Sequence, residues 1–289
     1  MKCTLCPRGC GVDREATLGA CSVPSEIRIA KSMLHMWEEP PISGENGSGA
    51  IFFSGCPLKC VFCQNKEISH TGKGKTISLN DLAKLFLDLQ KRGAHNINLV
   101  SPTQYSDKIR DALDLVKGEI KIPIVYNTSG YELDTELEKM RSYVDIFLTD
   151  IKYFSSELSS EYSRASDYFE VAKKALLKML DIVPKCVFDE NGIMKNGVIL
   201  RHLVMPSHRA DSIKILDEIA SVIDIKSIKL SLMSQYTPDF CDEKYKKINR
   251  RVTSFEYDSV VEHALALGYD GYIQERASAN KIYTPEWEI

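Results

Sequence analysis

Three cysteines with regular spacing form the most informative stretch of the chain. Cys56, Cys60 and Cys63 stand in the run Cys-Pro-Leu-Lys-Cys-Val-Phe-Cys, which follows an apolar run and a glycine. Thiolates are soft ligands, and this spacing lets three of them surround one face of an iron–sulfur cube, each bound to its own iron. The fourth iron is then open to a substrate, as an open zinc site is. A zinc knuckle or a redox pair is the alternative, although those sites usually use paired Cys-x-x-Cys ligands.

A second cysteine cluster occupies the amino-terminal stretch, where glycines are common and apolar residues are few. Its members are Cys3, Cys6, Cys10 and Cys21. Such a stretch cannot fold by burial alone, and a metal bound by four thiolates would supply the missing stabilisation. We therefore predict a closed second metal site, either structural zinc or an electron-transferring iron–sulfur cluster, and spacing does not decide between them. Four unliganded cysteines in a tail are disfavoured, because exposed thiols oxidise or scavenge metal.

The composition is that of an ordinary globular protein. The 289 residues include 37 Lys and Arg against 40 Asp and Glu, a formal charge of -3. No global field would draw such a chain to nucleic acid or to a membrane surface. No signal peptide or membrane-spanning run is evident, so we expect a cytoplasmic protein without nucleic-acid or membrane partners.

Short apolar runs alternate with polar-faced helical stretches after Cys63, which is typical of parallel strands joined by crossover helices. The expected strands are Ala50–Ser54, Asn96–Val100, Ile122–Asn127, Asp145–Asp150, Gly197–Val204 and Ile228–Leu232. The expected helices are Leu79–Arg92, Ser106–Lys117, Asp134–Ser142, Asp167–Ile182 and Ala210–Val222. This α/β pattern predicts a partial (β/α)6 barrel of the TIM type, with Tyr272–Gln274 as a candidate seventh strand.

We expect two domains, a cysteine-rich metal module with its connector over residues 1–48 and the barrel with a carboxyl-terminal extension over residues 49–289. Within the connector, Arg28–Met33 suits a short strand, whereas Trp37–Gly44 is too rich in proline for regular structure. The basic run Lys244–Arg251 suits a solvated helix face better than a nucleic-acid or protein contact.

Polar residues follow each expected strand. In βα barrels the functional residues sit at the carboxyl ends of the strands, where the loops converge. These ends carry the cysteine loop, Ser101-Pro102-Thr103-Gln104, Asn127-Thr128-Ser129-Gly130, Asp150-Ile151-Lys152, Arg201-His202 and Ser234-Gln235-Tyr236. The series predicts one shared pocket, although any single end could be an ordinary turn.

The cysteine loop resembles the Cys-x3-Cys-x-aromatic-Cys motif of the radical S-adenosylmethionine (SAM) superfamily, with Phe62 as the aromatic residue. The whole chain is similar to the subgroup related to pyruvate formate-lyase activating enzyme, which activates glycyl radical enzymes. Beyond the loop, the resemblance rests on the segments Cys3–Val12, Trp37–Pro40, Ile42–Gly44, Gln64–Asn65 and Ser101–Thr103. It implies a [4Fe-4S] cluster on Cys56, Cys60 and Cys63, with SAM on the open iron, and a radical SAM type of barrel.

The resemblance also implies a set of SAM contacts. Ser101 and Pro102 stand where the family has a glycine-rich loop, whose backbone meets the amino group of SAM. Asp150 and Lys152 match an Asp-x-Lys pair, in which Lys152 would bind the methionine carboxylate, and Arg201 matches a basic SAM contact. Phe62 is either packed in the core or in contact with the adenine. The remaining candidates for cofactor binding are Thr103, Asn127, Ser129 and Gln235.

Two departures from the family pattern are visible. The Gly-Gly-Glu-Pro type of loop is replaced by Val100–Thr103, and an acidic residue common at the third strand end is Asn127. The second change puts a monovalent cation site in doubt. Glu38, Glu39 and His202 have no assigned role, since the sequence does not place them in the pocket or outside it.

Three functions follow from this reading. The first is a radical SAM enzyme that abstracts a hydrogen atom from a glycine of a glycyl radical enzyme. The second is a radical SAM enzyme that modifies a small molecule or a peptide. The third is a scaffold that binds SAM and iron–sulfur without turnover. An enzyme of either kind needs an electron donor such as ferredoxin or flavodoxin.

Overall fold

A computed structural model describes residues 2–274 and residue 287. Its strands form a ten-stranded sheet, with the order β10-β9-β8-β6-β5-β4-β2-β1-β3 and with β7 paired to β8 outside this path. The strands are β1 (Ile27–His35), β2 (Ser48–Phe53), β3 (Lys75–Ile77), β4 (Ile97–Val100), β5 (Ile124–Thr128), β6 (Ile146–Asp150), β7 (Val187–Phe188), β8 (Met194–Leu203), β9 (Ile228–Met233) and β10 (Gly271–Ile273).

The pairs from β2 through β4, β5, β6, β8 and β9 to β10 are all parallel. The path ends at β10 and β3, which do not pair, so the sheet is an open, partial barrel. Each of the six expected strands is present, and β10 confirms the candidate seventh. Their β-branched and aliphatic residues explain the agreement, because strands that are covered on both faces are apolar along their whole length.

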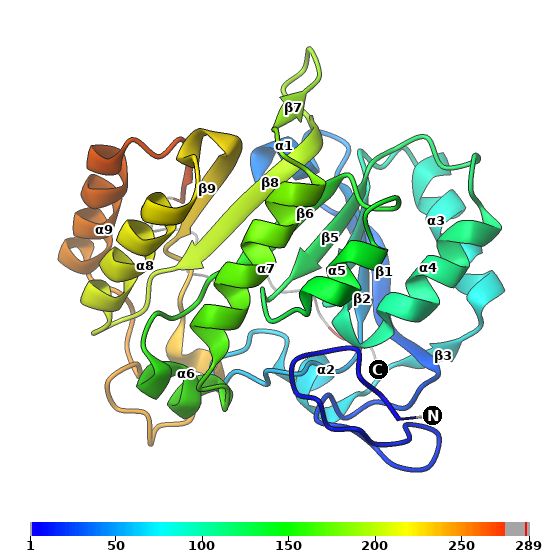
Figure 1. The fold of residues 1–289 in the computed structure, drawn as a ribbon, viewed down its shortest axis with the longest axis horizontal. Coiled ribbons are helices and arrows are strands. Elements are labelled where there is room, and N and C mark those ends of the chain that lie inside the picture. Colours follow the sequence, from blue (N-terminus) through cyan, green and yellow to red (C-terminus); the bar gives the residue numbers. More distant parts are fainter. Residues whose placement is uncertain (1, 275–286, 288–289) are drawn as a thin grey trace.

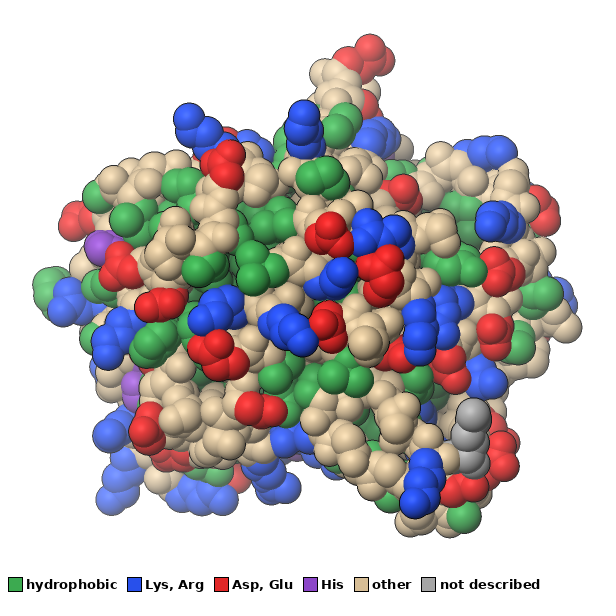
Figure 2. Space-filling view, viewed as in Figure 1, with side chains coloured by type: hydrophobic (Ala, Val, Ile, Leu, Met, Phe, Trp, Pro, Cys, Tyr) green, Lys and Arg blue, Asp and Glu red, His purple; other side chains and the backbone are tan. Residues whose placement is uncertain are grey.

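Helices cover the outer face of the curved sheet (Figure 1). The helices of the described residues are α1 (Pro40–Ser43), α2 (Lys66–Thr71), α3 (Leu79–Lys91), α4 (Ser106–Leu115), α5 (Asp134–Lys139), α6 (Ser156–Ser163), α7 (Tyr168–Ile182), α8 (Arg209–Val222) and α9 (Ser254–Leu267), of which α2 and α6 lie below the strand ends. Short 3-10 turns occupy Thr103–Tyr105, Ile225–Ser227 and Pro238–Phe240. Helix α3 begins with a capping box between Ser78 and Asp81, a pair that satisfies free backbone N–H groups. On the face seen in Figure 2, acidic and basic side chains are interspersed over these helices.

Two local expectations were wrong. Residues 37–44 contain α1, because Pro40 and Pro41 occupy its first turn, where proline is tolerated. The basic run 244–251 forms turns and no helix. Within it only Ile248 is fully buried, so the run has no apolar stripe to hold a helix against the core. Its cationic side chains are exposed, as expected.

The connector belongs to the main sheet. β1 runs antiparallel to β2 from the pair Ile29 and Phe53 to the pair His35 and Ser48. The expected domain boundary at residue 48 thus falls inside a hairpin. We propose that the cysteine-rich module ends before Ile27, and Figure 1 places this amino-terminal stretch beside α2 and β3. No helix in the described part of the chain is long and apolar enough to cross a membrane.

Candidate functional site

A cavity of about 260 Å³ lies where the carboxyl ends of the parallel strands meet the cysteine loop. Eleven of the candidate residues line it: Cys56, Cys60, Phe62, Cys63, Ser101, Asn127, Ser129, Asp150, Lys152, Arg201 and Gln235. Pro102 and Thr103 are not among its lining residues. The Thr103 hydroxyl donates instead to Glu132, with 2.5 Å between Oγ1 and Oε1. The topology therefore brings the strand ends together as expected, and contacts from Pro102 and Thr103 to SAM stay predictions.

The side chain of Gln104 positions the start of the cysteine loop. The Gln104 side chain donates through Nε2 to the carbonyl oxygens of Ser54, Gly55 and Ser101, at 3.0, 3.1 and 2.8 Å. This fixes the loop after β2 to the loop after β4. Lys59, between two of the cysteines, has a positive φ of 51°, a conformation that side chains with a Cβ seldom adopt. The loop is thus held in a shape that local preference does not dictate.

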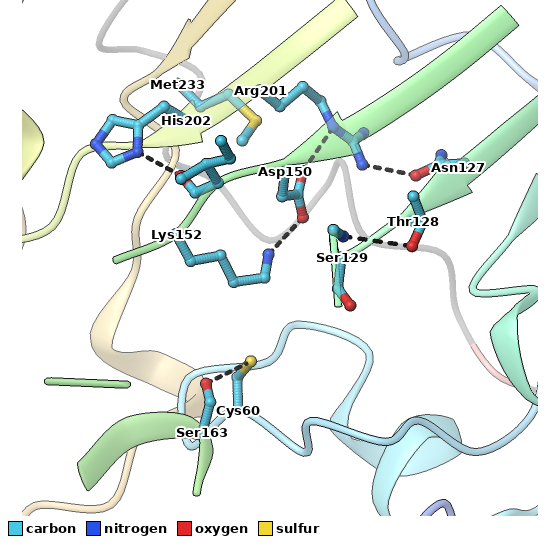
Figure 3. Close-up of polar contacts among 12 residues, drawn as sticks. Cys60, Asn127, Thr128, Ser129, Asp150, Lys152, Ser163, Arg201, His202 and Met233 are labelled. Carbon is cyan, nitrogen blue, oxygen red and sulfur yellow. Dashed lines mark hydrogen bonds and ion pairs between the residues drawn. The ribbon is translucent and has the colours of Figure 1, made fainter. Parts of the chain in front are cut away.

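Two hydroxyl groups reach the sulfur atoms. Ser163, at the end of α6, donates to Cys60 with 3.0 Å between Oγ and Sγ, and Ser69 on α2 lies 3.3 Å from the Cys63 sulfur. Figure 3 shows the Ser163 contact below the strand ends. Burial raises the pKa of Cys56 to about 12, and the neighbouring thiols Cys60 and Cys63 add to the effect. Burial likewise raises the pKa of Cys63. These two thiols are therefore poor anions alone, and a bound metal would supply the compensating charge.

A network of charged side chains crosses the barrel interior above these thiols (Figure 3). Arg201 on β8 donates through Nε to Asp150 at 2.9 Å and through Nη2 to the side-chain oxygen of Asn127 at 2.6 Å. Lys152 pairs with the other oxygen of Asp150. Arg201 and Asp150 thus hold each other in place, and the ammonium of Lys152 points toward Asp150 (Figure 3).

Glu38 is the member of this network that the sequence did not assign. Its Oε1 accepts from Asn98 at 3.0 Å and from Asn127 at 3.2 Å, and its Oε2 lies 3.3 Å from Nη1 of Arg201. Glu38 comes from the segment between β1 and α1, so the cavity has one wall that precedes the first parallel strand. Glu39 is also buried but does not line the cavity. No local sequence pattern marks Glu38, because its partners Asn98, Asn127 and Arg201 are all distant in the chain.

Charge pairing determines the protonation of these groups. Burial alone would raise the pKa of Asp150, but Arg201 and Lys152 outweigh it and hold the pKa below its usual value. Burial raises the pKa of Glu38, with Arg201 opposing the effect. Burial also opposes the charge of Lys152, yet Asp150 raises the pKa of this amine. Asp150, Lys152 and Arg201 are therefore charged together at neutral pH, in a site that is shielded from water.

The loop after β4 keeps a glycine-like backbone without glycine. Ser101 has a φ of 58°, and its N–H donates to the carbonyl of Asn127 at 2.9 Å. The left-handed conformation costs a residue with a Cβ roughly 1 kcal/mol. The chain holds that conformation through the neighbouring strand end and Gln104. Ser101 thus holds a conformation that glycine adopts most readily.

The contacts of three further residues show whether each belongs to the cavity. Phe62 is 8% exposed, lines the cavity and packs against Tyr236 with ring centroids 5.8 Å apart, so it serves both the core and the cavity wall. Gln235 lines the cavity and accepts from Gln274 at 3.3 Å. His202 is buried away from it, with Nδ1 donating to the Ile151 carbonyl at 2.7 Å and Nε2 bonded to Ser212 at 2.8 Å. Burial lowers the pKa of His202, which fits a neutral, structural ring.

The amino-terminal cysteines lie near one another, outside the cavity. The sulfur atoms of Cys10 and Cys21 lie 3.1 and 3.8 Å from the point where a Cβ on Gly19 would stand. Burial raises the pKa of Cys6 to about 12, and Cys21 and Cys3 are close enough to add to it. Across the described residues, the cysteine loop included, no group of three or more His, Cys, Asp or Glu side chains is already arranged to hold a metal ion. In both cysteine sets it is therefore the type and spacing of the donors that suit a metal. The second metal site stays a prediction.

Comparison with known families decides the chemistry of the cavity. The family model described as "Radical SAM superfamily" matches residues 50–196, which contain the cysteine loop and the strand ends from β2 to β6. The chain belongs to the radical SAM superfamily. The chemistry that this family implies uses a [4Fe-4S] cluster and SAM.

The radical SAM chain has relatives along most of its length. It is 31% identical over 272 residues to an uncharacterized protein of Methanocaldococcus jannaschii, covering 91% of this chain and 74% of the relative. It is 23% identical over 219 residues to the pyruvate formate-lyase-activating enzyme of Clostridium pasteurianum, covering 72% of this chain and 82% of that enzyme. The solved structure of Streptococcus suis SuiB bound to S-adenosylmethionine matches with a TM-score of 0.51 and 14% identity. That match covers 76% of this chain and about half, 48%, of SuiB, and it concerns the fold alone.

The residues of the cavity fit the cofactors of a radical SAM enzyme. The donor set on the cysteine loop is three thiols, which suits a cluster with one open iron. A carboxylate, an ammonium and a guanidinium line the same cavity at Asp150, Lys152 and Arg201. SAM carries an ammonium, a carboxylate and a sulfonium, so it needs acceptors and a cation at separate points, and this lining offers both.

Proposed function

We propose that this radical SAM protein abstracts a hydrogen atom from a glycine of a partner protein, as an activating enzyme does. The supporting observation is the joint lining of one cavity by Cys56, Cys60, Cys63 and the charged strand ends. It stands together with the alignment over 72% of the chain to an enzyme named for that activity.

The cofactors and the protein have separate tasks in this proposal. When bound, the reduced cluster and SAM supply a 5′-deoxyadenosyl radical, by one-electron cleavage of the sulfonium. Lys152 binds the methionine carboxylate, and Asp150 keeps Lys152 in position. The backbone of Ser101 receives the amino group, and Phe62 flanks the adenine. The buried walls would keep dioxygen and unintended hydrogen donors away from the reacting centre.

An exposed aromatic residue at the rim of the cavity favours a macromolecular substrate. Trp37 lines the cavity and is 60% exposed. Large aromatic side chains at the edge of a pocket are common at protein interfaces, where they anchor a partner. We propose that Trp37 contacts the loop that carries the target glycine.

Isotope transfer tests the substrate class. The reconstituted, reduced protein is incubated with SAM and with extract from source cells grown on glycine deuterated at its α carbon. The extract is separated by size into macromolecules and small molecules, and the 5′-deoxyadenosine is analysed by mass spectrometry. The proposal expects deuterium in 5′-deoxyadenosine with the macromolecular fraction, and none with a Cys60→Ala control. Stimulation by the small-molecule fraction alone, or unlabelled product from the macromolecules, would reject a glycine target.

A further inference from the structure

The two cysteine sets of this chain meet through the backbone. The N–H of Cys56 donates to the carbonyl of Cys21, with 3.3 Å between N and O. Cys21 is the last residue of the amino-terminal set, and Cys56 is the first of the cysteine loop. A prospective ligand of one metal centre is thus joined to a prospective ligand of the other by a single hydrogen bond.

The close approach depends on a glycine. Gly55 has a φ of 81°, and a Cβ at this position would stand 2.6 Å from the Cys21 carbonyl oxygen and 2.7 Å from a methyl carbon of Val23. Any side chain there would push the amino-terminal stretch away from Cys56. Gly55 therefore permits the contact between the two cysteine sets.

An arginine fastens the module from a second side. Arg8 lies between Cys6 and Cys10, and it donates through Nε to the carbonyl of Pro57 and through Nη2 to that of Ser163, both at 2.8 Å. Pro57 follows Cys56 in the loop, and the Ser163 hydroxyl contacts the Cys60 sulfur. The stretch that carries the amino-terminal thiols is therefore bound directly to the cysteine loop at Pro57, and it is bound at Ser163 to the residue that contacts Cys60.

Cys10 is the most accessible thiol of the two sets. It is exposed, whereas Cys3, Cys6, Cys56 and Cys63 are half-buried and Cys21 and Cys60 are buried. A partner protein can therefore approach Cys10 more closely than any thiol of the cysteine loop.

We propose that Cys3, Cys6, Cys10 and Cys21 hold a second iron–sulfur cluster, which relays single electrons to the cluster on Cys56, Cys60 and Cys63. A one-electron protein reductant donates one electron to the outer cluster, which returns to its oxidised state as it passes that electron inward. The bonded route runs from the Cys21 sulfur along its backbone, across the hydrogen bond to Cys56 and on to the Cys56 sulfur. Soft thiolates also suit zinc, but zinc has no redox chemistry and would make no use of this route. The relay relies on radical SAM chemistry and is independent of the glycine target.

Metal content tests the identity of the second centre. A Cys56→Ala/Cys60→Ala/Cys63→Ala variant is reconstituted anaerobically with iron and sulfide, with equimolar zinc present. We expect about four irons and four sulfides per chain, with a paramagnetic signal after reduction, because one cluster remains. The wild type should hold about twice that amount. A triple variant that holds zinc and no iron, or no metal at all, overturns the proposal.

Reduction kinetics test the relay. A Cys6→Ala/Cys10→Ala variant keeps the inner cluster, whose signal is followed in rapid-freeze spectra. With reduced flavodoxin as the donor, the rate of inner-cluster reduction should fall by about tenfold or more. With dithionite, a small reductant, the rate should stay near that of the wild type. Equal rates with flavodoxin in the variant and in the wild type would refute the relay, even if the second cluster exists.

Two glycine variants distinguish an electron relay from a purely structural role of the amino-terminal cysteines. They also provide a test if the Cys6→Ala/Cys10→Ala variant does not fold. Gly55→Ala disturbs the contact with Cys21, while Gly93→Ala places the same strain in open space, because Gly93 has a φ of 86° and no atom within 4 Å of its Cβ position. With both clusters confirmed by iron content, Gly55→Ala should slow reduction by flavodoxin and Gly93→Ala should not. Equal rates in the two variants would refute the route through Cys21 and Cys56.

Discussion

Oε2 of Glu38 lies 3.3 Å from Nη1 of Arg201, although 163 positions separate the two residues in the chain. Asp150 binds the same guanidinium from the other side, at 2.9 Å. Two buried carboxylates therefore share one arginine, with Lys152 as the second cation of the group. The segment before α1 thus takes part in the electrostatics of the cavity, together with the parallel strands.

Removing Glu38 should weaken the fold and the site together. A Glu38→Ala change leaves Asn98, Asn127 and Arg201 without their common acceptor, and breaking a buried ion pair costs roughly 3 kcal/mol. Urea unfolding of the cluster-free protein measures this loss. Glu45→Ala, at an exposed position on the other side of α1, is the control and should change the free energy of unfolding by less than about 0.5 kcal/mol. Equal stabilities of the two variants would show that the Glu38 contacts contribute little.

Lys152 should govern SAM affinity. A hydrogen bond to a charged group contributes about 1.5–3 kcal/mol, so Lys152→Met should weaken binding by about tenfold to a hundredfold. Calorimetric titration of SAM into the reconstituted but unreduced protein measures binding without turnover. Lys117→Met, at an exposed position after α4, is the control. If both variants bind SAM as the wild type does, Lys152 serves only to hold Asp150.

Much of the fold was predictable, because the strands of a covered parallel sheet are continuous apolar runs. The run Ile97-Asn98-Leu99-Val100 is buried at every position, and it was recognised from its residues alone. The mouth of the cavity was predictable for the same reason, since the order of strands places their carboxyl ends at one edge. Lys152 and Arg201 were found in this way.

The remainder depended on contacts that sequence patterns do not encode. The sequence gives Glu38 no role, because its partners Asn98 and Arg201 are distant in the chain and no local period marks an inward-pointing glutamate. His202 follows Arg201 on the same strand, and adjacent residues of a strand point to opposite faces. The alternation of side chains along a strand therefore predicts that only one of the two residues faces the cavity. Arg201 lines the cavity and His202 does not. The contact between Cys21 and Cys56 is a backbone contact, which no side-chain pattern announces.

Ser163 should tune the reduction potential of the cluster. Its hydroxyl donates to the Cys60 sulfur, and such hydrogen bonds favour the reduced, more negative cluster. A net contribution of about 1 kcal/mol corresponds to roughly 40 mV for one electron, so Ser163→Ala should lower the potential by about that amount. Ser160→Ala, an exposed serine of the same helix, is the matched control. Redox titration followed by electron paramagnetic resonance decides, and an unchanged potential in Ser163→Ala would count against this bond.

Glu132 should make the stability of the cluster-free protein depend on pH. Burial raises its pKa from the usual 4.5 to about 7, although the hydroxyls of Thr103 and Thr128 donate to it and oppose the shift. Because the folded pKa is the higher one, the folded state binds more protons than the unfolded state between pH 4.5 and pH 7. The contribution of Glu132 to stability is therefore most favourable below pH 4.5 and falls as pH rises through 7.

A Glu132→Gln variant should remove this dependence and keep the packing, since an amide oxygen still accepts from Thr103 and Thr128. At pH 8 the variant should be more stable than the wild type by up to about 3 kcal/mol, the energy equivalent of the shift. Near pH 4.5 the two proteins should be alike. Urea unfolding between pH 4.5 and pH 8 measures the difference, with Glu45→Gln as the control for loss of an exposed carboxylate. A constant difference across this range would mean that Glu132 titrates alike in both states, and that the hydroxyls of Thr103 and Thr128 fully offset its burial.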